Sequence, residues 1–133
     1  MAKILVVDDE PTLLTLIAAA LRKDGHNVTA IGNPLEVVDQ VQGNLSDFTL
    51  IVTDVDMKPI TGFEVVSRLT DVGWFGAVLF MSGHSSKSGV IVESLGQRAV
   101  IEKPFTADEL RSAVALALSS ANYKRKNSRQ PAR

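Results

Sequence analysis

The chain has 133 residues, a length that fits one globular domain, and 45% of them are hydrophobic, which is enough for a sizeable core. It contains no cysteine, so disulfides and thiolate chemistry are excluded. The net charge is −1, but residues 121–133 carry five basic side chains and no acid, which leaves −1 − 5 = −6 on the remainder.

Runs of β-branched residues alternate with segments of helical period along the chain. In chain order we predict a strand at Lys3–Val7, a helix from Pro11 closed by Gly25, a strand at Asn27–Ile31, a helix from Pro34 capped by Asn33, a strand at Thr49–Thr53, a helix at Phe63–Val72, a strand at Ala77–Met81, a helix at Lys87–Leu95, a strand at Ala99–Glu102 and a helix at Thr106–Ser120. The fourth helix has poor propensity because it contains Gly89 and three consecutive β-branched residues. The last is well marked, because Thr106 and Glu109 have the spacing of a capping box.

Five strands alternating with five helices predict an α/β fold in which a parallel sheet has helices on both faces. For a chain of this size we expect the flavodoxin-like (βα)5 arrangement, with strand order 2-1-3-4-5. This domain is predicted to occupy residues 1–120 and to be followed by a basic, disordered tail at 121–133. The tail lacks aromatic interleaving, so nucleic-acid binding is not expected.

No segment of the sequence has the properties of a membrane or export signal. The apolar run Ile4–Val7 is too short for a signal peptide and ends in acids. Nowhere do apolar residues approach the ~20 that are needed to cross a bilayer. We therefore expect a cytoplasmic protein that does not insert into a membrane.

Acidic residues stand at the carboxyl ends of the first and third strands, the two ends that flank the ligand crevice in this strand order. Asp8 and Asp9 follow the first strand, and Asp54 and Asp56 follow the third. Several carboxylates this close together repel one another unless a cation lies among them. Since the candidate ligands are all oxygens, a hard ion is indicated, and Mg²⁺ fits best.

Two further polar residues are expected at the same edge of the sheet, because Ser82 ends the fourth strand and Lys103 follows the fifth. A divalent ion, a lysine and a hydroxyl donor are the groups that phosphoryl transfer requires. A carboxylate can serve as the nucleophile and form an aspartyl phosphate. Asp54 is best placed for this role, because it ends the central strand.

Four blocks of sequence carry a resemblance to a known family: ILVVDDEP (4–11), DVDMKPITGFE (54–64), VLFMSGH (78–84) and EKPFTADEL (102–110). In order and spacing they resemble the receiver domain of two-component response regulators, over about residues 3–120. The resemblance implies a stand-alone, chemotaxis-type single-domain regulator that accepts a phosphoryl group from a histidine kinase or phosphotransfer protein. Such a domain is not an enzyme in the usual sense, because it catalyses only its own phosphorylation and dephosphorylation.

The resemblance also implies a role for each candidate residue. It makes Asp54 the phospho-acceptor, Asp9 a direct Mg²⁺ ligand, Asp8 a ligand through water, the backbone carbonyl of Asp56 a further ligand, Ser82 the switch hydroxyl, and Lys103 the phosphate contact, joined to Pro104 by a cis peptide bond. No second domain is expected to follow. The signal is therefore expected to pass to a separate protein target through the face made by helix 4, strand 5 and helix 5.

The chain departs from the family pattern at several positions. Lys58 stands where a proline is usual, and Pro59 follows it. Val100 replaces the aromatic residue whose rotation commonly reports phosphorylation, so that readout is excluded here. Asp56 and His84 occupy two positions that tune dephosphorylation in the family.

Two alternative functions stay open on the sequence alone. The segment around Asp54 also resembles the D-x-D nucleophile strand of haloacid-dehalogenase-like phosphatases, although the further acids of that family follow its lysine. A degenerate receiver acting as a constitutive binding module is the second alternative. Individually, Asp9 could be a helix cap, Asp56 a turn residue and Lys103 an ordinary surface lysine.

Overall fold

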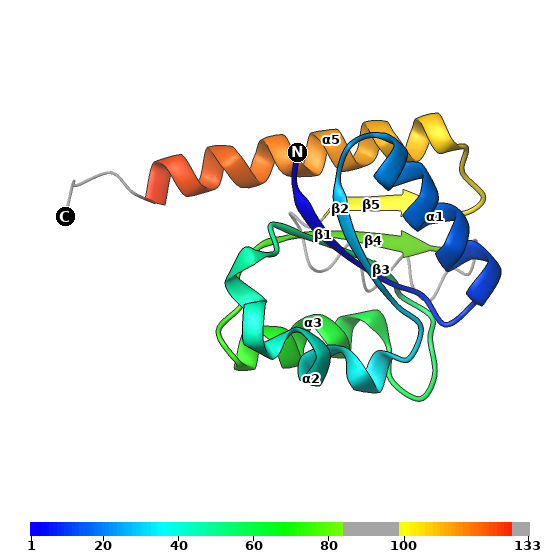
Figure 1. Cartoon of the computed structure of the whole chain (residues 1–133), viewed down its shortest axis with the longest axis horizontal. Helices are drawn as coiled ribbons and strands as arrows, with labels where there is room; N and C mark the ends of the chain where they lie inside the picture. Colours follow the sequence, from blue (N-terminus) through cyan, green and yellow to red (C-terminus); the bar gives the residue numbers. More distant parts are fainter. Residues whose placement is uncertain (84–98, 129–133) are drawn as a thin grey trace.

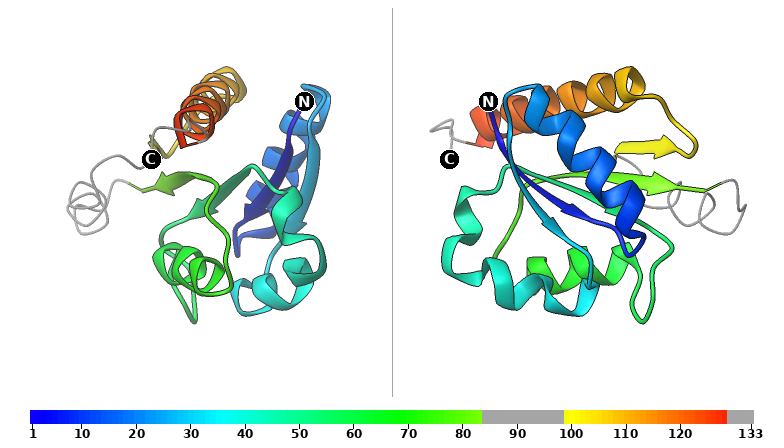
Figure 2. Two further views of the ribbon diagram at one scale, coloured as in Figure 1. Left: turned by 90° about the vertical axis from the view of Figure 1, so that its left-hand side faces the viewer. Right: turned by 45° about the vertical axis from the view of Figure 1, so that its right-hand side comes forward.

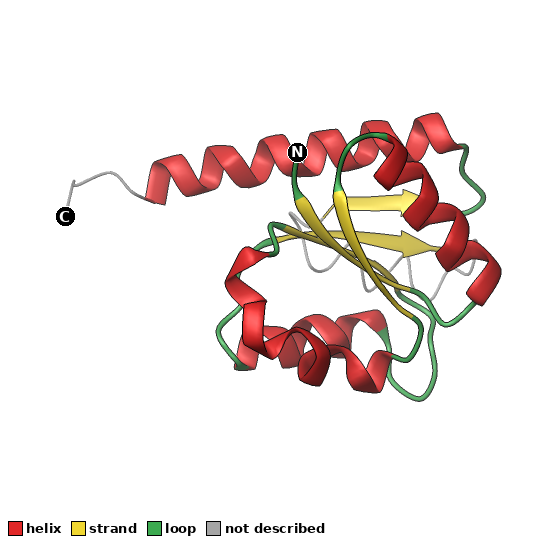
Figure 3. Cartoon of the chain, viewed as in Figure 1, coloured by secondary structure: helices red, strands yellow, loops and turns green. Residues whose placement is uncertain are grey.

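The computed structural model describes residues 1–83 and 99–128, with side chains described up to residue 119 in the last helix. Among them the elements are, in chain order, β1 (Lys3–Val7), α1 (Pro11–Lys23), β2 (Asn27–Ile31), the 3₁₀ segment η1 (Pro34–Glu36), α2 (Val37–Val41), the 3₁₀ segment η2 (Gln42–Asp47), β3 (Leu50–Asp54), α3 (Gly62–Asp71), β4 (Ala77–Ser82), β5 (Ala99–Glu102) and α5 (Ala107–Ser128). Figure 3 shows the strands side by side between the helices. The helix predicted at Lys87–Leu95 lies outside the described residues.

The five strands form one sheet in the order β2-β1-β3-β4-β5, and every neighbouring pair is parallel. This confirms the predicted flavodoxin-like order. Because β1 and β3 are neighbours, with Val7 paired to Thr53, their carboxyl ends lie side by side. All five carboxyl ends meet at one edge of the sheet, which is where the candidate site residues stand.

Helices cover both faces of the sheet (Figures 1 and 2): α1 and α5 lie on one face, and α2 and α3 lie on the other. Successive strand residues point to opposite faces. Ile4 and Val6 therefore pack with the α1 and α5 side, and Leu5 and Val7 with the α2 and α3 side. Burial on both faces explains why these strands read as continuous apolar runs rather than alternating ones.

The predicted strand and helix boundaries agree closely with the structure in most places. β1, β2 and β5 have the predicted bounds. The third strand is shifted by one residue, to Leu50–Asp54, so Asp54 is its last residue rather than the first residue of the loop. This places the Asp54 carboxylate on a rigid strand end.

The second helix is shorter and less regular than predicted. Asn33 caps it as expected, since its side chain accepts a hydrogen bond from the N–H of Leu35 at 3.0 Å. Only Val37–Val41 is α-helical, and 3₁₀ segments flank it. β-branched residues disfavour a helix here, and Asn44 adopts non-helical dihedral angles of φ −136° and ψ 32°.

The last helix begins as predicted but is longer. Thr106 and Glu109 form a reciprocal capping box, with hydrogen bonds of 2.8 Å and 3.0 Å. The helix continues past its predicted end at Ser120 to Ser128, where a disordered tail was expected, and Figure 1 shows its end projecting past the sheet. Alanine, lysine and arginine favour helices, and no glycine or proline interrupts the segment before Pro131. The domain boundary at residue 120 stays a prediction.

Trp74, the single tryptophan, packs at the opposite edge of the sheet, where the strands begin. Its indole Nε1 donates to the backbone carbonyl of Phe48 at 3.0 Å, and its ring is buried. Trp74 therefore has a packing role. None of the helices among the described residues has both the length and the apolar composition that a bilayer crossing requires.

Candidate functional site

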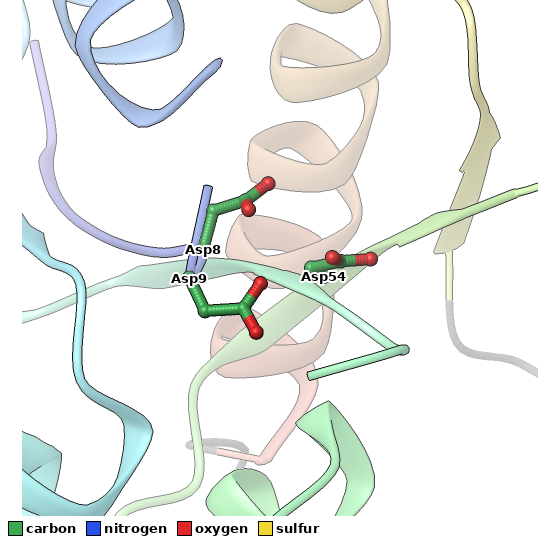
Figure 4. Close-up of side chains that lie close together, drawn as sticks. All are labelled: Asp8, Asp9 and Asp54. Carbon is green, nitrogen blue, oxygen red and sulfur yellow. The ribbon is translucent and has the colours of Figure 1, made fainter. Parts of the chain in front are cut away.

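Three carboxylates gather where β1 and β3 end (Figure 4). Asp8 and Asp9 come directly after β1, and Asp54 is the last residue of β3. One carboxylate oxygen from each lies within 4.8 Å of the others. Asp8 is fully buried and Asp54 is 6% exposed, whereas Asp9 is exposed to solvent. The structure thus brings together the carboxylates of three of the four acids that the sequence predicts at this edge.

Each of the three carboxylates accepts a hydrogen bond from a backbone N–H of the loop that surrounds it. Glu10 N–H donates to Asp8 Oδ1 at 2.9 Å, Asp56 N–H to Asp54 Oδ1 at 3.3 Å, and Lys58 N–H to Asp9 Oδ2 at 3.3 Å. These contacts orient the carboxylates without neutralising their charge. The pattern of side chains along the sequence contains no direct sign of them, because a backbone N–H is present at every residue except proline.

Lys103 is the basic member of the cluster. It follows β5, and its ammonium Nζ lies 3.2 Å from Asp54 Oδ2 and 3.4 Å from Asp8 Oδ2. Its backbone N–H donates to the carbonyl of Ser82 at 2.7 Å, and its bond to Pro104 is cis, as the resemblance implied. The reading of Lys103 as an ordinary surface lysine is therefore wrong, since it bridges two buried acids.

Burial and charge act against each other in this cluster. Burial raises the pKa of Asp54 to about 6, although the nearby Lys103 ammonium acts to lower it. Burial raises the pKa of Asp8 in the same way. For Lys103, burial alone would lower the pKa, but the attraction of Asp54 and Asp8 outweighs it and the pKa is raised. One ammonium is thus not enough to offset the cost of keeping these acids ionised.

A hard divalent cation fits this donor set. The three ligand candidates are carboxylates, and they carry three negative charges against the single positive charge of Lys103. Mg²⁺ prefers oxygen ligands and accepts a site with few protein ligands, because it keeps several waters. The uncompensated charge of buried acids is a physical reason for such an ion to bind here.

Ser82 stands at the same edge, at the end of β4. Asp54 pairs with Met81 in the neighbouring strand, so Ser82 lies one residue beyond the level of Asp54. It is 5% exposed, and its Oγ donates to the carbonyl oxygen of Gly83 at 3.1 Å. The neighbouring candidate His84 lies outside the described residues.

The segment after β3 contains Asp56, the last of the predicted site residues, and also a residue whose importance the sequence did not reveal. Asp56 is exposed and lies beside the cluster, since its N–H contacts Asp54; its carbonyl oxygen as an ion ligand stays a prediction. The Lys58–Pro59 bond is cis. The residue whose importance was missed is Gly62, since a β-carbon there would lie 2.1 Å from the carbonyl oxygen of Asp54.

Comparison with protein families gives a match to the model described as the response regulator receiver domain, over residues 4–115. Among curated proteins, the transcriptional regulatory protein TcrA of Mycobacterium tuberculosis is 35% identical over 109 residues, which cover 81% of this chain and 42% of TcrA. Sporulation initiation phosphotransferase F of Bacillus subtilis is 30% identical over 114 residues, which cover 84% of this chain and 90% of that protein. The chain thus spans less than half of TcrA but most of the phosphotransferase.

Solved structures show the same fold. A response regulator receiver domain protein of Clostridium thermocellum superimposes with a TM-score of 0.80 at 27% identity, covering 92% of this chain and 98% of that one. NtrX of Brucella abortus gives a TM-score of 0.84 at 27% identity, covering 96% of this chain but 29% of NtrX. The similarity therefore extends over almost all of the sheet and its helices.

Proposed function

This chain belongs to the response regulator receiver domain family, and from that premise we propose that it is a phosphorylation-activated switch of a two-component system, with Asp54 as the phospho-acceptor. The family is a signalling domain rather than a classical enzyme. The observation that carries the proposal is the position of Lys103, whose ammonium lies within 3.4 Å of both Asp54 and Asp8 while Asp9 lies beside them.

We assign a Mg²⁺ ion to the acidic pocket, since receiver domains bind Mg²⁺ in such a pocket. Asp9 and Asp54 would hold the ion directly, Asp8 through water, and the Asp56 carbonyl oxygen would add a further ligand. When bound, the ion supplies positive charge to the oxygens of an incoming phosphoryl group. The donor set supports this assignment because it consists of oxygens that carry more charge than Lys103 balances.

In the proposed reaction an ionised oxygen of Asp54 attacks the phosphorus atom of a phosphohistidine on the donor protein. The O–P bond forms, the P–N bond breaks, and its electron pair returns to the imidazole nitrogen. With a pKa of about 6, Asp54 is mostly ionised at neutral pH even before the ion binds. The Lys103 ammonium, 3.2 Å from Asp54 Oδ2, would contact a phosphoryl oxygen and neutralise part of its charge.

The phosphoryl group adds ~1.5–2 negative charges beside Ser82 and Lys103. We propose that the Ser82 hydroxyl then exchanges its contact with the Gly83 carbonyl for a phosphoryl oxygen. Such an exchange would shift an existing equilibrium between two arrangements of this edge of the sheet. Since position 100 is a valine, the signal has to be read without an aromatic rotor.

We further propose that the switch signals by binding a separate protein through the face of helix 4, β5 and α5. Helix 4 lies outside the described residues, but the other two elements expose apolar side chains. Val100 on β5 is 41% exposed, and Leu116 on α5 is 69% exposed. The donor would be a histidine kinase or a phosphotransfer protein. Since the phosphate that either one carries comes ultimately from ATP, the proposal places the chain in the cytoplasm.

Mass spectrometry after incubation with acetyl phosphate and Mg²⁺ tests this function. We expect a mass gain of one phosphate that hydroxylamine removes, that EDTA prevents, and that is lost in Asp54→Asn. Asp71→Asn, at the far end of α3, provides the matched control, since it removes a carboxylate and keeps the acceptor. Labelling that persists in Asp54→Asn would refute the assignment. Multiple turnover of a simple phosphate ester would instead support a haloacid-dehalogenase-like phosphatase.

A further inference from the structure

The three carboxylates of the site are not held equally well. Asp8 and Asp54 are buried, and among the described residues each carboxylate contacts a backbone N–H through Oδ1 and the Lys103 ammonium through Oδ2. Asp9 is exposed, and within the described part of the chain its carboxylate has one polar contact, the backbone N–H of Lys58 at 3.3 Å. As far as the described residues go, this hydrogen bond is what orients the Asp9 carboxylate.

The contact joins two loops that are distant in sequence. Asp9 lies between β1 and α1, whereas Lys58 lies between β3 and α3, 49 residues further along. Lys58 uses its main chain for this contact, and its side chain is not needed. The contact takes Oδ2 of Asp9 and leaves Oδ1 for an ion. A proline at position 58, which is usual in the family, would have no N–H to give, so this contact distinguishes the chain from the family pattern.

We propose that the backbone N–H of Lys58 is a positioning group of the cation site, which holds the Asp9 carboxylate toward Asp54 and so raises the affinity of the site for Mg²⁺. This inference rests on the proposed function, because it assigns the ion to Asp9. An exposed carboxylate that rotates freely must be ordered when it binds an ion, and an existing hydrogen bond reduces that cost. Removing a group that hydrogen-bonds to a metal ligand typically weakens metal binding 10- to 100-fold.

The test compares two variants of the whole chain that differ in the N–H group. Lys58→Ala removes the ammonium but keeps the N–H, whereas Lys58→Pro removes both. We expect isothermal titration calorimetry to give a Mg²⁺ affinity for Lys58→Ala within about threefold of the natural chain, and an affinity at least ~10-fold weaker for Lys58→Pro. Melting in EDTA provides the second measurement, because a group that only positions a metal ligand should leave the melting temperature of Lys58→Pro close to that of Lys58→Ala.

A third variant covers the case in which proline disturbs the loop or prevents folding. Replacing the amide between Met57 and Lys58 by an ester removes the N–H and keeps the lysine side chain, and we expect the same ~10-fold loss of Mg²⁺ affinity. If the ester and Lys58→Pro both bind Mg²⁺ as tightly as Lys58→Ala, the inference is wrong and the proposed function stands. If the natural chain itself binds no Mg²⁺, the proposed function is what fails.

Discussion

Gly62 lies so close to Asp54 that a β-carbon on Gly62 would come within 2.1 Å of the Asp54 carbonyl oxygen. The N–H of Gly62 also donates to the carbonyl of Val55 at 3.0 Å. The first residue of α3 is thereby fixed against the end of β3. This close approach of two main chains is possible because position 62 has no side chain, and it holds the backbone beneath the proposed acceptor in place.

We expect Gly62→Ala to lower the free energy of unfolding by roughly 2 kcal/mol or more, because neither backbone can move without breaking the strand end. Urea denaturation measures this loss. Gly43→Ala is the matched control, since a β-carbon there meets nothing within 4 Å and should change stability by less than ~0.5 kcal/mol. Equal stability of the two variants would contradict the close approach.

Replacing Lys103 by methionine keeps an apolar stem of similar length and removes the ammonium between Asp8 and Asp54. We expect the initial rate of Asp54 labelling by acetyl phosphate to fall by roughly 100-fold, the usual effect of deleting one group that stabilises developing charge. Phosphate incorporation at saturating Mg²⁺ is the measurement. Arg68→Met, which breaks an exposed pair with Glu64, should leave the rate unchanged.

The raised pKa of Asp54 predicts a dependence of stability on pH in the absence of divalent ions. The folded chain binds a proton with a pKa of about 6, whereas an unfolded aspartate does so near its model value of 3.8. This contribution to stability is therefore fully present below about pH 4 and is lost as the pH rises through about 6. Burial raises the pKa of Asp8 as well, which adds in the same direction.

In EDTA we thus expect the free energy of unfolding to be about 1 kcal/mol higher at pH 5 than at pH 7.5 from Asp54 alone. Asp54→Asn should reduce this difference and make the chain more stable at pH 7.5, because the buried charge is gone. Urea denaturation at the two pH values gives both quantities. Stability that increases from pH 5 to pH 7.5 in the natural chain would mean that Asp54 is better solvated than its burial indicates.

Magnesium should stabilise the folded chain, because the cluster of three carboxylates exists only after folding. At a free concentration of 100 times the dissociation constant, the gain is ~2.7 kcal/mol, which a thermal melt at pH 7.5 detects as a higher melting temperature. The gain should be smaller at pH 5, where protons compete for the carboxylates. Asp9→Asn should lose most of it, whereas Asp71→Asn, at the far end of α3, should keep it.

Much of the fold could be predicted from the sequence because the strands are buried on both faces. The resulting runs of β-branched residues mark β1, β2 and β5 with the bounds that the structure has. The second helix could not be predicted as closely, since its 3₁₀ segments depend on packing against its neighbours more than on propensity. The extension of α5 was missed because charge was taken as a sign of disorder, although lysine and arginine favour helices.

The side chains of the candidate site could be predicted because parallel strands bring their carboxyl ends to one edge, and the acids, Ser82 and Lys103 all stand at such ends. The sequence could not reveal how the main-chain groups around these side chains are oriented. The N–H groups of Glu10, Asp56 and Lys58 act through their direction in space, which no residue type encodes. The importance of Gly62 likewise depends on a distance between two segments.

The position of Trp74 has a practical consequence. Its indole is buried at the edge where the strands begin, anchored to the Phe48 carbonyl, whereas the acids stand where the strands end. Since it is the single tryptophan, the intrinsic fluorescence of the protein comes mainly from a site remote from the chemistry. Its emission should follow global unfolding and remain insensitive to modification of Asp54. Tryptophan fluorescence can therefore be used to compare the global stability of the variants.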